Sequence, residues 1–148
     1  MASLELYGFE SLQDALTRLD HIPEQVIKES LDEMAEVAMA KIRAQGESMG
    51  VRDPESGVHI LDKLSRNAKA KKTSYGGYTL VTFTGSRRRG KKGTETRNAE
   101  IAFVTEYGRR NMRARPFIGL AMNKYEEAIT DPAEKKIGAW IESEFYRN

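Results

Sequence analysis

Cysteine is absent from this chain of 148 residues, which has four prolines, two histidines and one tryptophan. Without cysteine the chain forms no disulfide and no thiolate metal site, and a reducing compartment is permitted. No apolar run approaches the ~18–20 residues that a membrane span needs. The first residues also lack the basic start and apolar stretch of a signal peptide. We therefore expect no membrane association, and a protein that stays on the cytoplasmic side or is packaged in a particle.

Sequence motifs for catalysis and metal binding are missing as well. His21 and His59 are far apart in the sequence, and neither belongs to a metal-binding motif. No His-x-x-x-His pair, Gly-x-Ser-x-Gly motif or phosphate-binding loop occurs. The late glutamates have the spacing of a solvated helix face rather than of metal ligands. They are Glu126, Glu127, Glu142 and Glu144. We predict a protein that is not an enzyme and that binds no metal and no cofactor.

Charge is nearly balanced overall but unevenly distributed. The chain has 24 basic and 22 acidic residues, so composition alone does not indicate a nucleic-acid-binding protein. Residues 126–144 are acidic, with six carboxylates against Lys135 and Lys136. The middle of the chain is basic between residues 87 and 97, where Glu95 is the single acidic residue. Its basic residues are Arg87, Arg88, Arg89, Lys91, Lys92 and Arg97.

Helical periodicity predicts four helices. Apolar residues at i, i+4 and i+7 indicate a short helix over residues 11–20. The longest amphipathic stripe follows, over residues 23–44. Residues 116–129 form the third predicted helix, with a proline in its first turn. The fourth covers residues 131–145, with a capping aspartate, a proline at the first helical position and a glutamate two residues later.

Two segments rich in β-branched and aromatic residues predict strands, at residues 78–84 and 99–105. The polar segment 85–98 between them is predicted to be the loop of an antiparallel hairpin. That loop is longer than the usual two to five residues, which indicates a functional role. Residues 46–57 are interpreted as a loop, residues 58–65 as either helix or strand, and residues 69–77 as a connector.

These elements predict one α+β domain that spans residues 1–148, since no internal repeat and no linker divides the chain. In this arrangement an antiparallel sheet with a long hairpin packs against a long helix from the N-terminal half and two C-terminal helices.

One part of the sequence resembles a known family. The segment 101–108 ends in Glu106, Tyr107 and Gly108, and a run of Ala, Arg, Pro and Phe follows at 114–117, with the small Ala121 one turn later. Together they resemble the tail-completion (neck) proteins of long-tailed bacteriophages and prophages, in which an apolar strand ends in Glu-aromatic-Gly before a helix opened by Ala-Arg-Pro-Phe. The matching residues of the second element are Ala114, Arg115, Pro116 and Phe117.

The N-terminal segment 7–12 also looks like the opening of that family, with an aromatic residue, a glycine and a hydrophobic residue before the first helix. The chain departs from the family at residues 50–57, in place of the usual Ala-Pro-Val and Thr-Gly-x-Leu pattern. It departs again at Arg109, where a small residue is usual. The likeness covers the layout of the whole chain and is sharp over some twenty residues.

The same motif has a physical interpretation as a folding element. Gly108 suits a positive φ at the end of a strand, and Pro116 suits the start of a helix. Phe117 is expected to anchor that helix to the sheet. Glu106 and Arg115 are candidates for a charge-assisted pair between strand end and helix start. Both residues are equally candidates for contacts with a neighbouring subunit.

The basic segment 87–97 has three interpretations. It is a solvated loop, an arm that contacts a neighbouring subunit or the next ring, or a loop that faces DNA in a tail lumen. It contains no aromatic residue for stacking on bases.

The resemblance implies a structural virion subunit at the head-proximal end of a phage tail, where a ring of copies completes the tail and allows the head to join. It implies six-fold symmetry in the virion, although the isolated subunit can be a monomer. Expected partners are other copies, the tail tube or tail terminator protein, and head-completion or connector proteins. The alternatives are a tail terminator ring, which stops tube growth, and a basic nucleic-acid-binding module. The expected location is the virion, after assembly in the host cytoplasm.

Overall fold

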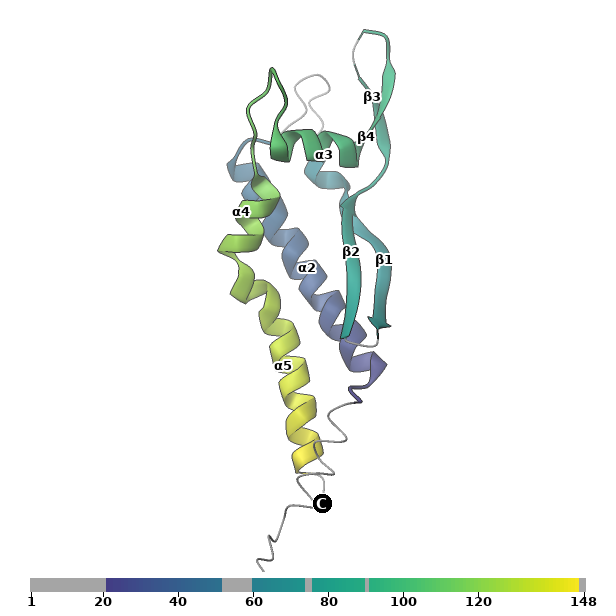
Figure 1. Cartoon of the computed structure of the whole chain (residues 1–148), viewed down its shortest axis with the longest axis vertical. Helices are drawn as coiled ribbons and strands as arrows, with labels where there is room; N and C mark the ends of the chain where they lie inside the picture. Colours follow the sequence, from purple (N-terminus) through teal and green to yellow (C-terminus); the bar gives the residue numbers. More distant parts are fainter. Residues whose placement is uncertain (1–20, 52–59, 74–75, 90, 147–148) are drawn as a thin grey trace, which may run out of the picture.

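The computed structural model describes residues 21–51, 60–73, 76–89 and 91–146. It has an α+β fold, which confirms the predicted class (Figure 1). The predicted helix at residues 11–20 lies outside the described residues. In chain order the described elements are α2 (Glu24–Ser48), a 3₁₀ helix (Ile60–Lys63), β1 (Leu64–Thr73), β2 (Gly76–Phe83), β3 (Ser86–Arg89), β4 (Thr94–Arg97), α3 (Asn98–Tyr107), α4 (Phe117–Lys124) and α5 (Glu126–Phe145).

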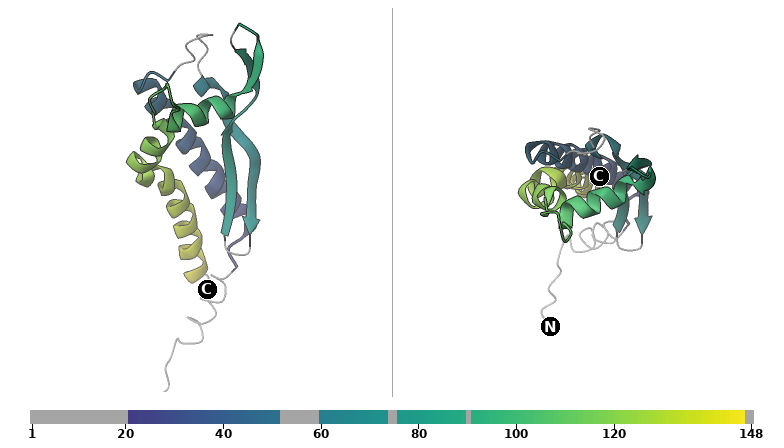
Figure 2. Two further views of the ribbon diagram at one scale, coloured as in Figure 1. Left: turned by 45° about the horizontal axis from the view of Figure 1, so that its top comes forward. Right: turned by 90° about the horizontal axis from the view of Figure 1, so that it is seen from above.

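Helix α2 is the central element of the fold. It contacts α4 and α5 on one side and the β1–β2 hairpin on the other (Figures 1 and 2). Helix α3 lies at the end of the molecule where α2 has its C-terminal end (Figure 1). Because two layers cover it, α2 buries residues at helical spacing: Ile27, Ser30, Ala35, Ala38, Met39, Ile42 and Gly46. The long predicted helix is therefore confirmed, and so are the two helices in the C-terminal part of the chain.

Helix α2 continues one turn beyond its predicted end, so residues 46–48 of the predicted loop belong to the helix, and Gly46 is buried there. A Cβ at this position would lie 2.6 Å from a methyl carbon of Leu61, so the glycine makes room for the core. The helix ends where Gly50 adopts a φ of +63°. The Gly50 and Val51 N–H groups donate to the carbonyls of Glu47 and Gly46, at 3.0 and 2.9 Å, which is the Schellman arrangement.

The predicted strand at residues 78–84 is confirmed as β2, but its predicted partner is wrong. β2 pairs antiparallel with β1, from Leu64 opposite Phe83 to Thr73 opposite Gly76. The prediction of a connector at residues 69–77 is therefore wrong, because residues 69–73 belong to β1 and residues 76–77 to β2. Two register shifts interrupt β1, and this explains why its sequence shows no regular alternation of polar and apolar residues.

The predicted strand at residues 99–105 is wrong, because these residues belong to helix α3. Ile101, Ala102, Thr105 and Glu106 are buried, a spacing that places one side of a helix against the body. The Thr105 hydroxyl donates to the Ile101 carbonyl at 2.8 Å, four residues earlier. A short apolar run of this kind fits a strand and a buried helix equally well, so periodicity alone does not distinguish the two. Here the run packs against the body as a helix.

The predicted loop at residues 85–98 is also wrong for most of its length. It forms a second antiparallel hairpin, β3–β4, in which Ser86, Arg87, Arg88 and Arg89 lie opposite Arg97, Thr96, Glu95 and Thr94. The fold therefore has two separate two-stranded sheets in its described part, rather than one sheet with a long loop.

The boundary between the last two helices differs from the predicted one. α4 ends at Lys124 and α5 begins at Glu126, so Asp131 does not cap a helix, and Pro132 lies inside α5. Asp131 instead forms an i, i+4 ion pair with Lys135 at 2.7 Å. The chain turns at Tyr125, whose ring lies 4.6 Å from the ammonium of Lys41 on α2.

The hydrophobic core lies where α2, the 3₁₀ helix, β2, α3 and α4 meet. Phe117 is completely buried there, and its ring meets Phe83 of β2 edge to face at a centroid distance of 6.0 Å. This contact confirms that Phe117 anchors its helix to the sheet. The core consists of Met39, Ile42, Val51, Ile60, Leu61, Leu64, Phe83, Ile101, Ala102, Phe117 and Ala121.

Replacing Phe117 with alanine is expected to lower the free energy of unfolding by about 3–5 kcal/mol, because a large cavity opens in the core. Phe103 is the matched control, since 63% of it is exposed, and Phe103→Ala is expected to change that energy by less than about 0.5 kcal/mol. Chemical denaturation of both variants measures the difference. Equal losses would contradict this description of the core.

Candidate assembly surface

Glu106 joins α3 to the start of α4. Its side chain is buried, and its two carboxylate oxygens accept hydrogen bonds from the backbone N–H groups of Ile118 and Gly119, at 2.9 and 2.8 Å. These N–H groups belong to the first turn of α4, which has no hydrogen-bond acceptors of its own for them. The carboxylate also faces the positive end of the helix dipole. Glu106 therefore acts as a cap supplied by another helix.

The predicted pair between Glu106 and Arg115 is wrong. The Arg115 guanidinium instead donates to the Gly50 carbonyl at 3.0 Å, just beyond the end of α2. The backbone N–H of Arg115 donates to the Thr105 carbonyl at 2.7 Å. Arg115 thus ties the segment before α4 to both α2 and α3.

Gly108 and Pro116 are the first and last residues of the segment that connects α3 to α4. Gly108 has the predicted positive φ, +75°, but it ends a helix rather than a strand. A Cβ there would lie 2.8 Å from the backbone nitrogen of Ala114 and from the Met112 carbonyl oxygen. Pro116, with φ −76° and ψ +63°, forms an inverse γ-turn in which the Phe117 N–H donates to the Arg115 carbonyl at 2.8 Å.

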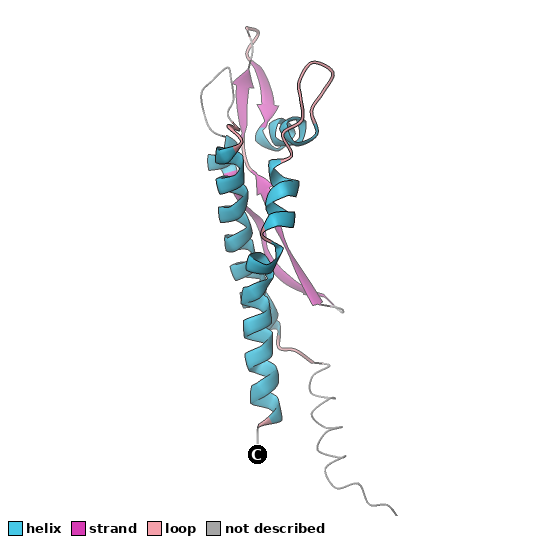
Figure 3. Ribbon diagram, turned by 90° about the vertical axis from the view of Figure 1, so that its left-hand side faces the viewer, coloured by secondary structure: helices cyan, strands magenta, loops and turns pink. Residues whose placement is uncertain are grey.

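The residues between these two points form a projecting basic turn. Two backbone hydrogen bonds of 3.0 and 2.9 Å join Arg109 and Met112 across its tip. Because Gly108 and Ala114 are so close, the chain between them is directed away from the body (Figure 3). Three of the side chains between Gly108 and Ala114 are exposed cations, Arg109, Arg110 and Arg113. Ala114 is exposed as well.

Tyr107 is the one aromatic residue of the motif that packing inside the chain does not explain. It is 69% exposed, and its ring lies against that of Phe103, one turn earlier on α3, with centroids 4.8 Å apart. Phe103 is not recognisable as a surface residue when residues 99–105 are taken as a strand. In a helix, Phe103 and Tyr107 stand at i and i+4, where their side chains are neighbours.

The basic segment 87–97 forms most of the β3–β4 hairpin, which we call the arm (residues 86–97). The arm leaves the body at the same end as the basic turn (Figures 1 and 3). Its main contact with another described element is the one between β4 and α3. Arg87 and Arg89 are half-buried, and Arg87 donates to the Asn98 side chain at 2.8 Å. The exposed cations of the arm are Arg88, Lys91, Lys92 and Arg97.

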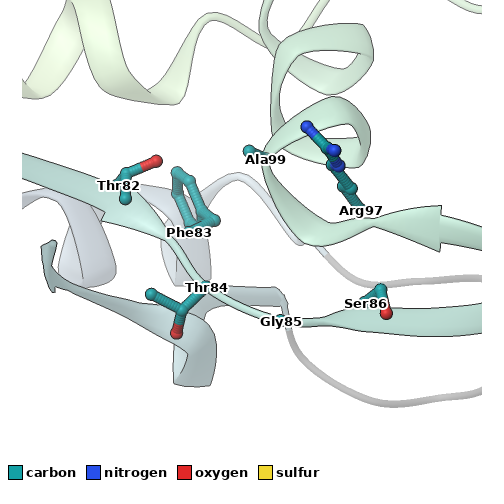
Figure 4. A pocket seen from close by; sticks show the side chains of 7 residues that line it. All are labelled: Thr82, Phe83, Thr84, Gly85, Ser86, Arg97 and Ala99. Atoms are coloured by element: carbon teal, nitrogen blue, oxygen red, sulfur yellow. The ribbon is translucent and has the colours of Figure 1, made fainter.

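Asn98 holds the base of the arm. It is almost completely buried, its amide donates to the Thr84 carbonyl at 2.7 Å, and its backbone N–H donates to the Gly85 carbonyl at 3.0 Å. An open groove lies beside this junction (Figure 4). It is lined by Thr82, Phe83, Thr84, Gly85, Ser86, Arg97 and Ala99.

Most acidic residues in the described part of the chain lie on α2 and α5. Some of them brace the helices: Lys136 of α5 lies 3.1 Å from Glu33 and 3.3 Å from Glu29 of α2. Hydrogen bonds to these two carboxylates raise the pKa of Lys136 above its usual value. Arg66 of β1 pairs in the same way with Asp32 of α2. These contacts are exposed, so each contributes little to stability.

Within the described residues, no group of three or more His, Asp or Glu side chains is placed to hold a metal ion. None of the described helices combines the length and apolar character of a membrane span. Comparison of the chain with protein-family models, curated proteins and solved structures finds no match.

Replacing Glu106 with alanine is expected to lower the free energy of unfolding by about 1–3 kcal/mol, because two N–H groups of α4 lose their acceptor. Glu100 lies on the same helix but is exposed, and Glu100→Ala is expected to cost less than about 1 kcal/mol. Thermal and chemical denaturation test this. If the two variants are equally stable, the cap does not hold α4.

Two glycines with positive φ provide a second test. Gly50→Ala is expected to cost about 1–2 kcal/mol from backbone strain alone, since no atom lies within 4 Å of its Cβ position. Gly108→Ala is expected to cost a further ~1–3 kcal/mol, because its Cβ meets backbone atoms. Denaturation curves of both variants measure the gap, and equal costs would show that the connection at Gly108 adjusts without strain.

Proposed function

We propose that this protein is a structural subunit of a long-tailed phage virion. Copies of it form a ring at the head-proximal end of the tail, complete the tail and allow the head to join. The observation that carries the proposal is the arm, a folded hairpin that stands on a base at Asn98 and leaves the body. A hairpin of this kind gains few contacts within its own chain, so its packing is completed by another molecule.

The resemblance to tail-completion proteins supports the proposal from the sequence. The residues that carry it, Glu106, Gly108, Arg115 and Phe117, form one connected unit between α3 and α4. Tyr107 stays on the surface with Phe103, and exposed aromatic residues of this kind are common anchors of protein interfaces. Partners in this role are other copies, the tail tube or tail terminator protein, and head-completion or connector proteins.

Removal of the gene product from the phage or prophage that encodes it tests the proposal. Electron microscopy is expected to show full heads and separate tails of normal length, because the tail grows but its upper end is not finished. Wild-type protein supplied in trans is expected to restore joined particles. Tails of uncontrolled length would assign the protein to tail termination instead. Joined, normal particles without the gene product would contradict a structural role.

The same genetic background tests the arm itself. The Gly85 carbonyl and the Asn98 N–H are hydrogen-bonded at its base, so a short glycine linker can replace residues 86–97. The shortened protein is expected to fold and yet to fail in restoring joined particles. Restoration at the wild-type level would contradict the role given to the arm.

The exposed cations of the arm favour a second candidate, a nucleic-acid-binding module. Such a module binds duplex DNA tightly at low salt and loses affinity steeply as salt is raised, because phosphate contacts release counterions. A salt titration with duplex DNA separates the two candidates. A structural subunit binds weakly at every salt concentration.

A further inference from the structure

Charge is divided between two parts of this chain. Residues 86–115, which contain the arm, α3 and the basic turn, have ten basic and three acidic residues. The rest of the chain has fourteen basic and nineteen acidic residues. The nearly neutral sequence therefore carries its basic excess in residues 86–115 and its acidic excess in the rest of its length. Such a division lets one region of a molecule attract another region of an identical molecule.

Three exposed cations of the arm are not used to hold the fold together. Arg88, Lys91 and Lys92 are exposed, and none of them forms an ion pair with a described residue. The single carboxylate on the arm, Glu95, accepts a hydrogen bond from the Ser86 hydroxyl. The arm therefore presents these three cations, together with the exposed Arg97 of β4, to a partner.

Helix α5 carries a matching set of carboxylates on its outer side. Glu127, Glu134 and Glu142 are seven and eight residues apart, which places them within about 80° around the helix axis. Ile129 and Lys136, which are buried or face α2, lie on the opposite side. All three glutamates are exposed, and within the described part of the chain none has an ion-pair partner. We call this set the acidic stripe.

We propose that the arm of one copy docks on the acidic stripe of the next copy. The contact joins two different surfaces, so it is heterologous, and it closes into a ring where the rotation between neighbours allows. The arm and α5 lie on opposite sides of the molecule and toward opposite ends (Figure 1), so neither surface blocks the other. The inference rests on the proposed function and deepens it by naming the two surfaces that join neighbouring subunits.

A second copy explains more of the surface than duplex DNA does. DNA would occupy the cations of the arm and leave the acidic stripe without a partner, on a helix in which another carboxylate, Asp131, is already paired with Lys135. The self-contact satisfies both sets at once. The self-contact also agrees with an arm that projects from the body, because in this contact the arm binds a second copy and not its own chain.

Two charge-reversed proteins test the contact. The arm variant carries Arg88→Glu, Lys91→Glu and Lys92→Glu, and the stripe variant carries Glu127→Lys, Glu134→Lys and Glu142→Lys. A control with the same change of net charge as the arm variant carries Lys63→Glu, Lys71→Glu and Lys72→Glu, which are exposed lysines of the 3₁₀ helix and β1. Circular dichroism confirms that each protein is folded, and sedimentation measures self-association at low and high ionic strength.

The wild-type protein and the control are expected to associate at low salt, and less at high salt. Each reversed variant alone is expected to associate at least about tenfold more weakly, because three attractions become repulsions. The decisive sample is an equal mixture of the two reversed variants. In it the acidic arm of one meets the basic helix of the other, and association is expected to return.

Three results would overturn the contact. The first is a wild-type protein that stays monomeric at low salt at the highest attainable concentration. The second is association that neither reversal weakens. The third is a mixture that does not recover. An arm variant that associates normally and loses only binding to duplex DNA would make the arm a nucleic-acid surface. None of these results bears on particle microscopy, so the proposed role in the tail is judged separately.

Discussion

The buried carboxylate of Glu106 is the constraint on which the packing of α3 and α4 depends. A buried charge is costly unless hydrogen bonds satisfy it. Here the first N–H groups of α4 do so, at the positive end of that helix. The bond network sets where α4 begins, and thus places Phe117, its first residue, in the centre of the core against Phe83. One side chain on α3 therefore determines how α4 packs.

This close junction also determines what lies outside the core. Because Gly108 is in contact with the backbone of Ala114, the residues between them have no room within the body and project from it. Their cations consequently lie at the same end as those of the arm. The cationic end of the molecule is thus a product of tight packing beneath it. The two basic segments, which α3 separates along the chain, project from the same end (Figure 1).

The two groups of charged residues serve different purposes. On α2, carboxylates meet Arg66 and Lys136, and so they help to align β1 and α5 with the central helix. On the arm and on the outer side of α5, charges of opposite sign remain exposed and apart. Complementary charges on two separate surfaces of this kind are the basis of the self-contact proposed above.

Local patterns in the sequence by themselves determined the long helix α2, the strand β2, the presence of two C-terminal helices, the positive φ of Gly108 and the anchoring role of Phe117. Each depends on a periodicity or on the conformational limits of one residue. Only the tertiary structure decided that residues 99–105 form a helix, that β2 pairs with β1, and that Glu106 bonds to a helix start rather than to Arg115. The reason is physical: a short apolar run, an irregular strand and a buried carboxylate each accept several partners, and the available partner is set by distant parts of the chain.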